Sequence, residues 1–149
     1  MKNYIGTKMV KAEPMNRGDY NTYRGWQIPS DENPSDDGYV LEYPDGYVSW
    51  SPKKQFEDAY RDCMGMTFGI ALELLKKGVK VAREGWNGKN QYIELASNIS
   101  YTSFDGEVVN CEHDAIGNKA IAFVGTSGVQ MGWLASQADM LAEDWVLVE

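Results

Sequence analysis

One run of residues with chemical potential is Cys111, Glu112, His113 and Asp114. A cysteine and a histidine two positions apart on a strand face the same side, so a thiolate–imidazole pair is geometrically possible. Nucleophilic catalysis also needs a group that orients the imidazole and an oxyanion hole, and the sequence shows a motif for neither. The spacing matches no common four-ligand zinc pattern. We favour a polar loop with a half-buried cysteine over catalysis or metal binding, and we expect no cofactor.

Two tryptophans stand where ligands commonly bind. Trp86 lies at the end of a predicted strand beside the turn Asn87-Gly88, and Trp133 lies where a strand meets the start of a helix. Loops of this kind on a rigid scaffold leave backbone N–H groups available. An indole offers a flat face to a purine base, and the first turn of the helix after Ser136 offers N–H donors to a phosphate or ribose oxygen. Arg83 can add a bidentate contact.

Each tryptophan also has a purely structural interpretation, as a core or interface aromatic with its N–H bonded. For Trp145, which precedes a Val-Leu-Val strand, we predict this structural role. Ser136 and Asp139 fit the acidic variant of a capping box, so helix capping accounts for Asp139, with ligand contact as an added possibility.

The elements that must position these residues follow from hydrophobic spacing. Thr67 is expected to cap a helix that carries apolar side chains at helical intervals from Phe68 and ends at Gly78. The alternation that follows predicts strands over Val79–Ala82, Gln91–Ala96, Glu107–Asn110, Ala120–Val124, Val129–Trp133 and Trp145–Val148. The fold class is therefore α+β, with a helix followed by an antiparallel sheet and a short helix before the last strand.

Residues 1–62 predict a smaller α+β module, joined by a linker at residues 62–65 to a domain of residues 66–149. Its expected elements are a strand over Tyr4–Ala12, a short helix over Asn16–Arg24, a loop over Pro29–Gly38 and a hairpin over Tyr39–Trp50. Ser51 is expected to cap a second helix, with Pro52 at its first position. The aromatic side chains expected to build the core are Tyr23, Trp26, Tyr43, Tyr47 and Trp50.

Composition argues against several classes of function. The chain of 149 residues has a net charge of −8, and residues 62–149 hold 6 basic and 12 acidic side chains. An acidic chain repels a polyanionic backbone, so we expect neither DNA nor RNA as a partner. The two cysteines form no CxxC pair, which favours a reducing cytoplasm. No signal peptide is visible, and no apolar run approaches the roughly 18 residues that span a bilayer, so no membrane association is expected.

Two blocks of the second domain carry a family resemblance. The residues from Met66 to Leu72 with KVAREGWNG at Lys80–Gly88, and then GWLASQADMLAEDW at Gly132–Trp145, resemble the second family of Thoeris anti-defense proteins. The resemblance implies a phage or prophage sponge in the cytoplasm of the infected bacterial host. It would sequester, without degrading it, the cyclic ADP-ribose-type signal of bacterial TIR-domain proteins. It also implies a homo-oligomer, commonly a tetramer, with pockets between subunits.

The resemblance also suggests details of the site. Some relatives hold cyclic oligonucleotides at a separate site, and the first module resembles a small module of phage and prophage proteins. Residues 98–118 are longer and more polar than the family pattern, which can reshape the mouth of a pocket. The ligand-binding residues implied for this chain are Phe68, Arg83, Trp86, Asn87, Trp133, Ala135, Ser136, Gln137 and Asp139.

Two other functions stay open. One is an enzyme that hydrolyses such a signal with Cys111, His113 or Asp114 as its base. The other is a phage structural or protein-interaction module in which the tryptophans anchor an interface.

Overall fold

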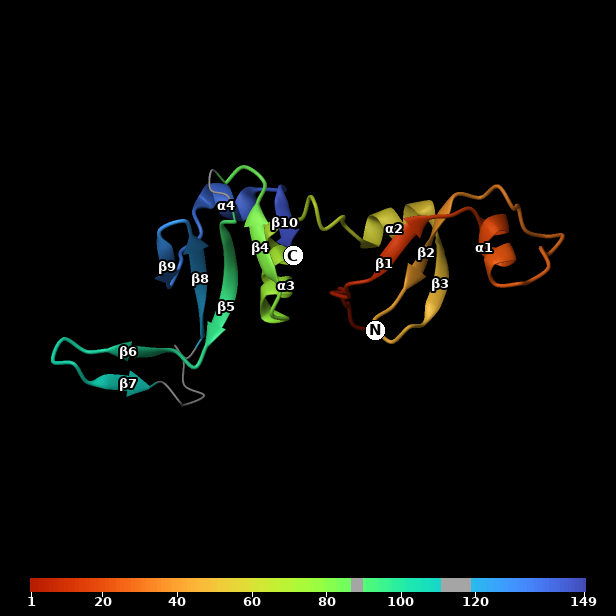
Figure 1. Cartoon of the computed structure of the whole chain (residues 1–149). Helices are drawn as coiled ribbons and strands as arrows, with labels where there is room; N and C mark the ends of the chain where they lie inside the picture. Colours follow the sequence, from red (N-terminus) through yellow and green to blue (C-terminus); the bar gives the residue numbers. More distant parts are fainter. Residues whose placement is uncertain (87–89, 111–118) are drawn as a thin grey trace. The chain divides into compact units, whose positions relative to one another are not determined.

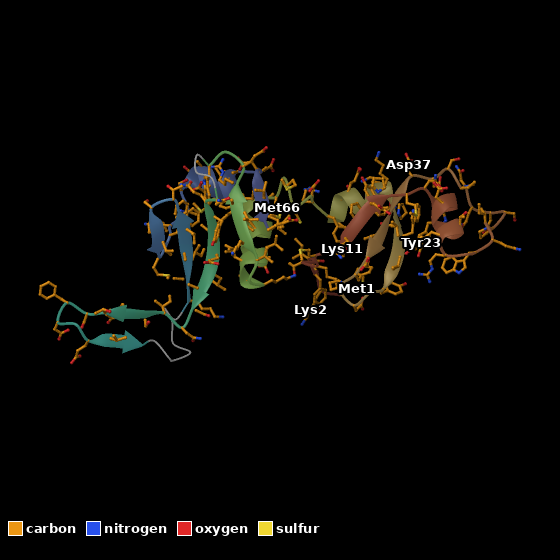
Figure 2. The ribbon with its side chains drawn as sticks, viewed as in Figure 1. Met1, Lys2, Lys11, Tyr23, Asp37 and Met66 are labelled. Carbon is orange, nitrogen blue, oxygen red and sulfur yellow. The ribbon has the colours of Figure 1, made fainter. Side chains whose placement is uncertain are left out.

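The computed structural model describes residues 1–86, 90–110 and 119–149, which form two compact units, Met1–Arg61 and Asp62–Glu149 (Figure 1). Helices and antiparallel sheets occur in both units, so the predicted α+β class is confirmed. Residues 62–65, expected to be a linker, belong to the second unit. The Leu147 N–H donates to the Cys63 carbonyl at 2.9 Å, and the fully buried Met66 (Figure 2) exchanges two backbone hydrogen bonds with Trp145.

Unit 1 (residues 1–61) holds a three-stranded antiparallel sheet with strand order β1-β2-β3. The strands are β1 (Lys11–Pro14), β2 (Gly38–Glu42) and β3 (Val48–Pro52), and Gly46 supplies the left-handed turn between the last two at φ 83°. The predicted hairpin is therefore confirmed. The strand predicted over Tyr4–Ala12 is wrong for most of its length, because β2 offers partners only from Lys11 onwards.

The two helices of unit 1 begin for different reasons. In α1 (Arg17–Tyr23) the Asn16 side chain accepts the Asp19 N–H at 2.8 Å, which confirms the helix predicted here. The prediction that Ser51 caps α2 (Lys53–Ala59) is wrong. Ser51 and Pro52 pair with Tyr39 and Gly38, so β3 continues through them and the helix begins one residue later.

Unit 1 buries few large side chains. Only Tyr20 and Leu41 are buried hydrophobic residues among its described side chains. The prediction that its aromatic residues form the core is wrong for three of them, since Tyr23, Trp26 and Tyr47 are 62%, 53% and 62% exposed.

Unit 2 (residues 62–149) is built on a five-stranded antiparallel sheet with strand order β10-β4-β5-β8-β9. These strands are β4 (Lys80–Arg83), β5 (Tyr92–Ser97), β8 (Lys119–Gly125), β9 (Gly128–Met131) and β10 (Trp145–Val148). A separate ribbon of β6 (Ser100–Thr102) and β7 (Val108–Asn110) projects away from this sheet (Figure 1). The sequence predicted every strand of unit 2 to within a few residues except the short β6.

Helices α3 (Phe68–Lys76) and α4 (Gln137–Leu141) complete unit 2. The Thr67 hydroxyl accepts the Ile70 N–H at 3.4 Å, so the predicted cap of α3 is confirmed. Helix α3 packs against β4, β5 and β10, and the buried cluster consists of Met66, Ala71, Leu74, Leu75, Val81, Ile93 and Trp145.

The two faces of the five-stranded sheet differ in their cover. Val81, Ile93 and Trp145 point to the side of α3, and α4 packs against α3 on that same side. Because side chains alternate along a strand, the other side carries Lys80, Ala82, Tyr92, Glu94, Ala96, Ala120, Ala122, Val124, Val129, Met131, Val146 and Val148. We call this surface the outer sheet face.

Across the residues that the structure describes, none of the helices has the length and apolar character needed to span a membrane.

Candidate ligand site

The three tryptophans of unit 2 meet in one cluster. The ring of Trp86 lies 6.0 Å from that of Trp133 and 5.5 Å from that of Trp145, and Trp133 lies 6.3 Å from Trp145, all edge to face. Trp145 is fully buried, which confirms its predicted core role. Trp86 and Trp133 are half-buried. The structure therefore brings together Trp86 and Trp133, the two tryptophans that the sequence singled out, and both pack against the buried Trp145.

Local backbone geometry fixes this tryptophan pair, Trp86 and Trp133. The Trp86 N–H closes a turn onto the Arg83 carbonyl at 3.2 Å, directly after β4. The Trp133 N–H bonds the Ile121 carbonyl at 2.8 Å, directly after β9 and Gly132, whose φ of 80° suits a residue without a side chain. The ring of Phe68 lies 5.3 Å from Trp145, so this predicted residue also joins the cluster.

The pair forms an aromatic corner. The planes of the two rings are inclined at 68°, so a planar base stacked on one ring would turn its edge toward the face of the other. Phe123 on β8, whose ring lies 5.2 Å from Trp86, supports the corner from within the sheet. The sequence did not single out Phe123, because its apolar type and strand position are those of any core residue.

A polar segment adjoins Trp133. Ala135 is half-buried, and Ser136 and Gln137 are exposed. The Ser136 hydroxyl accepts the Asp139 N–H at 3.1 Å, while the Asp139 carboxylate accepts the Ser136 N–H at 2.9 Å. This is the predicted capping box, which is confirmed and fixes the start of α4.

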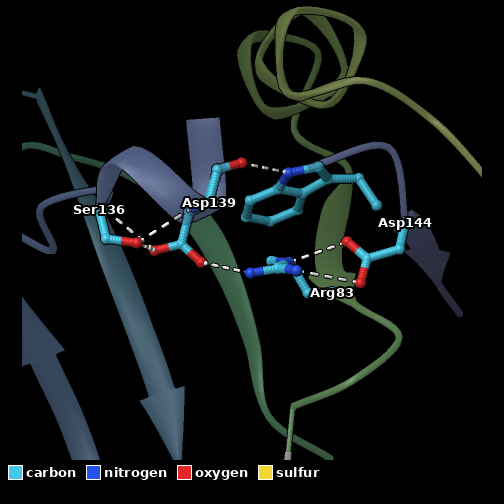
Figure 3. A network of polar contacts seen from close by, with 5 residues as sticks. Arg83, Ser136, Asp139 and Asp144 are labelled. Atoms are coloured by element: carbon cyan, nitrogen blue, oxygen red, sulfur yellow. Dashed lines mark hydrogen bonds and ion pairs between the residues drawn. The ribbon is translucent and has the colours of Figure 1, made fainter. Parts of the chain in front are cut away.

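Arg83 lies between two carboxylates (Figure 3). Its Nε and Nη2 donate to the two oxygens of Asp144 at 2.8 and 3.2 Å. Its Nη1 donates to Asp139 Oδ1 at 3.1 Å. The second oxygen of Asp139 accepts the Ser136 hydroxyl at 2.6 Å. We call these four residues, Arg83, Ser136, Asp139 and Asp144, the Arg83 network.

Ion pairing shifts the titration of this network. The hydrogen bonds that Arg83 donates, to Asp144 first and to Asp139 second, raise its pKa above the usual value. The bond from Arg83 lowers the pKa of Asp144. Burial opposes the charged form of Asp139, but hydrogen bonds from Ser136 and Arg83 outweigh it and lower the pKa of this carboxyl. Both carboxylates are therefore charged at neutral pH.

The sequence did not single out Asp144. It lies 61 positions from Arg83, and only the pairing of Arg83 with Trp145 in the sheet brings it close. To predict the contact between Arg83 and Asp144 from the sequence, one would have had to pair β4 with β10 in the correct register.

Other predicted residues lie outside this site. Asn87 and the run Cys111–Asp114 fall outside the described residues. Among the residues that the structure does describe, no group of three or more metal-binding side chains occurs. A hollow of about 280 Å³ lies in unit 1, lined by Lys11 and Tyr23 (Figure 2) among others, and involves none of the predicted site residues.

Unit 2 is similar to a known family of proteins. The family model described as the Thoeris anti-defense 2-like domain matches residues 66–148. The chain is 43% identical over 88 residues to Thoeris anti-defense 2 of Bacillus phage SP01, a match that covers 56% of this chain and 94% of that protein. These residues include the tryptophan pair and the Arg83 network, and through them the chain belongs to the Thoeris anti-defense 2-like family.

Proposed function

We propose that this chain is a phage anti-defense protein whose unit 2 binds and sequesters a cyclic nucleotide signal without changing it chemically. The signal is a cyclic ADP-ribose isomer of the kind made by TIR-domain proteins, with cyclic oligonucleotides as a second class to be tested. The observation that carries the proposal is the half-buried corner of Trp86 and Trp133 beside the polar segment at Ala135–Gln137. Family membership supports it.

The corner suits a purine-containing ligand. Stacking on an indole is worth about 1–3 kcal/mol per base and tolerates different bases. The exposed Ser136 and Gln137 offer polar groups within the same segment for ribose or phosphate oxygens. Phe68 belongs to the proposed lining, while Arg83 and Asp139 join the corner through Trp145. Asn87, which lies outside the described residues, stays in the proposal as a residue implied by the family resemblance.

We further propose that the working form is a homo-oligomer, with four subunits as the number that the family resemblance implies. The outer sheet face supports this. An antiparallel sheet covered on one side usually carries polar side chains on the other, whereas here Ala and Val outnumber the exceptions, Lys80, Tyr92 and Glu94. Val129 and Met131 on it are 62% and 47% exposed. A second copy would cover this surface, and a neighbouring subunit would supply walls that the open corner lacks.

A thermal-shift titration of the full chain against cyclic ADP-ribose isomers and cyclic di- and trinucleotides tests the function. A ligand at 100 times its dissociation constant should stabilise the native state by about 2.7 kcal/mol. The recovered ligand, checked by mass spectrometry, should be intact. An altered ligand would make the protein a hydrolase, and no shift with any member would favour an interaction module. Light scattering gives the molar mass, and a monomer would contradict the proposed assembly.

Alanine substitution localises the site. Trp86→Ala and Trp133→Ala should each weaken binding by about 1–3 kcal/mol, because one stacking face is lost. Trp26→Ala is the matched control, since it removes the same side chain from the exposed surface of unit 1 and should leave the affinity unchanged. Equal losses in all three variants would place the site elsewhere.

A further inference from the structure

The guanidinium of Arg83 is committed to protein carboxylates. Its three hydrogen bonds to Asp144 and Asp139 use three of its five N–H donors, and both carboxylates are partly shielded, with side chains 34% and 15% exposed. Two negative charges face one positive charge. The arrangement therefore offers an anionic ligand no net positive charge.

The network also holds an aromatic side chain in place. The backbone carbonyl of Asp139 accepts the indole N–H of Trp145 at 2.9 Å (Figure 3). The carboxylate of the same residue is held by Arg83 on one oxygen and by Ser136 on the other. Any shift of Asp139 consequently moves both the start of α4 and the bond that orients Trp145.

Trp145 connects Asp139 to the aromatic corner. Its ring touches those of Trp86 and Trp133. Arg83 is linked to the corner by a second route, because its carbonyl accepts the N–H of Trp86. The Arg83 side chain thus joins β4, α4 and the start of β10, which lead to Trp86, begin after Ser136 and carry Trp145, respectively.

We infer that Arg83 is a positioning residue, which holds the tryptophan pair and the Ala135–Gln137 segment in their binding geometry instead of contacting the ligand. The effect on binding rests on the proposed function. The contacts of the Arg83 network do not rest on it, because they join side chains of the protein itself.

The sharpest test removes a negative charge. If Arg83 bound an anionic ligand directly, Asp144→Asn would leave the affinity unchanged or improve it, because a competing carboxylate is gone. The positioning role predicts the opposite, about a tenfold loss, the lower end of what removal of an orienting residue costs around metal ligands. Arg83→Lys should lose about as much as Arg83→Met, because an ammonium cannot bridge two carboxylates with a planar fork. Glu143→Gln is the control, since it removes the same charge from the exposed neighbour of Asp144 and should change the affinity little.

A second measurement needs no ligand. In the full chain, hydrogen exchange of the Trp145 indole N–H, followed by NMR, should be about tenfold faster in Asp144→Asn and unchanged in Glu143→Gln. Asp144→Asn binding as tightly as the parent, or unchanged indole exchange, would overturn the inference. If the parent protein binds no member of the panel, the proposed function is refuted, but the positioning role is not. The indole exchange rate would still show whether the Arg83 network holds Trp145 in place. Asp144→Asn also keeps the test possible if Arg83→Met does not fold.

Discussion

The two units of this chain are stabilised in different ways. Unit 2 surrounds Trp145 with six other fully or nearly fully buried side chains. Unit 1 relies on polar ties between its helix and a loop: Arg17 pairs with Glu32, and Asn21 donates to the same carboxylate at 3.0 Å. A unit of about 60 residues buries a smaller share of its surface than a larger domain does, so hydrogen bonds and ion pairs must supply stability that its small core does not.

Both units place an arginine against carboxylates, with different consequences. In unit 1, Arg17 lies over the ring of Trp50 at 5.0 Å and fastens a loop. In unit 2, Arg83 fastens the segments around an aromatic corner. The same ion-pair chemistry thus serves loop closure in one unit and site geometry in the other. The difference lies in what the carboxylates are attached to.

The largest expected effect comes from the core of unit 2. Trp145→Ala should cost about 4 kcal/mol of stability, because it leaves a cavity in a packed cluster and unpairs the Asp139 carbonyl. Leu41→Ala, the corresponding truncation in unit 1, should cost about 2 kcal/mol, since fewer buried neighbours surround it. Peptide-resolved hydrogen exchange measures the loss in β4, β5 and β10 against that in β2. Equal losses would remove the contrast between the two units.

Local signals explain which parts of the fold the sequence could predict. The caps at Thr67 and Ser136 depend on contacts three residues apart, and both form as expected. The buried role of Trp145 followed from its apolar neighbours. Partners distant in the chain were out of reach, as the pairing of Arg83 with Asp144 illustrates.

Two errors of prediction in unit 1 share that origin. The β-forming residues from Tyr4 to Val10 have the composition of a strand, but β2 ends at Glu42, which pairs with Lys11, so the β1–β2 ladder does not extend to them. Tyr23, Trp26 and Tyr47 are aromatic, yet a three-stranded sheet offers too little interior to bury them. For the candidate site, residue type indicated the tryptophan pair, while only the fold revealed that Arg83 is held by carboxylates.

A smaller effect is expected from helix capping, and it separates a true cap from an apparent one. Ser136→Ala should destabilise unit 2 by about 1 kcal/mol, because the Asp139 N–H loses its acceptor. Ser51→Ala should change stability by only a few tenths, roughly, because Ser51 lies in β3 and caps no helix. Chemical denaturation of the two variants measures the difference. A larger loss from Ser51→Ala would contradict the strand assignment.

The smallest effect is expected from acid, since water screens ion pairs that are partly exposed. Asp139 and Asp144 have lowered pKa values in the folded state, so their contribution is present above the unfolded value of about 3.9 and is lost as the pH falls through the folded values. The pKa of Glu32 in unit 1 is lowered by Arg17 and Asn21, so both units should weaken below about pH 5. Thermal midpoints between pH 7 and pH 3 measure this slope. Arg83→Met should flatten it for the transition of unit 2, and Arg17→Met should flatten it for that of unit 1, because each removes the partner that lowers the pKa. Slopes that stay as steep as in the parent would mean that other carboxylates govern the acid response, and that the two arginines contribute no stability through charge.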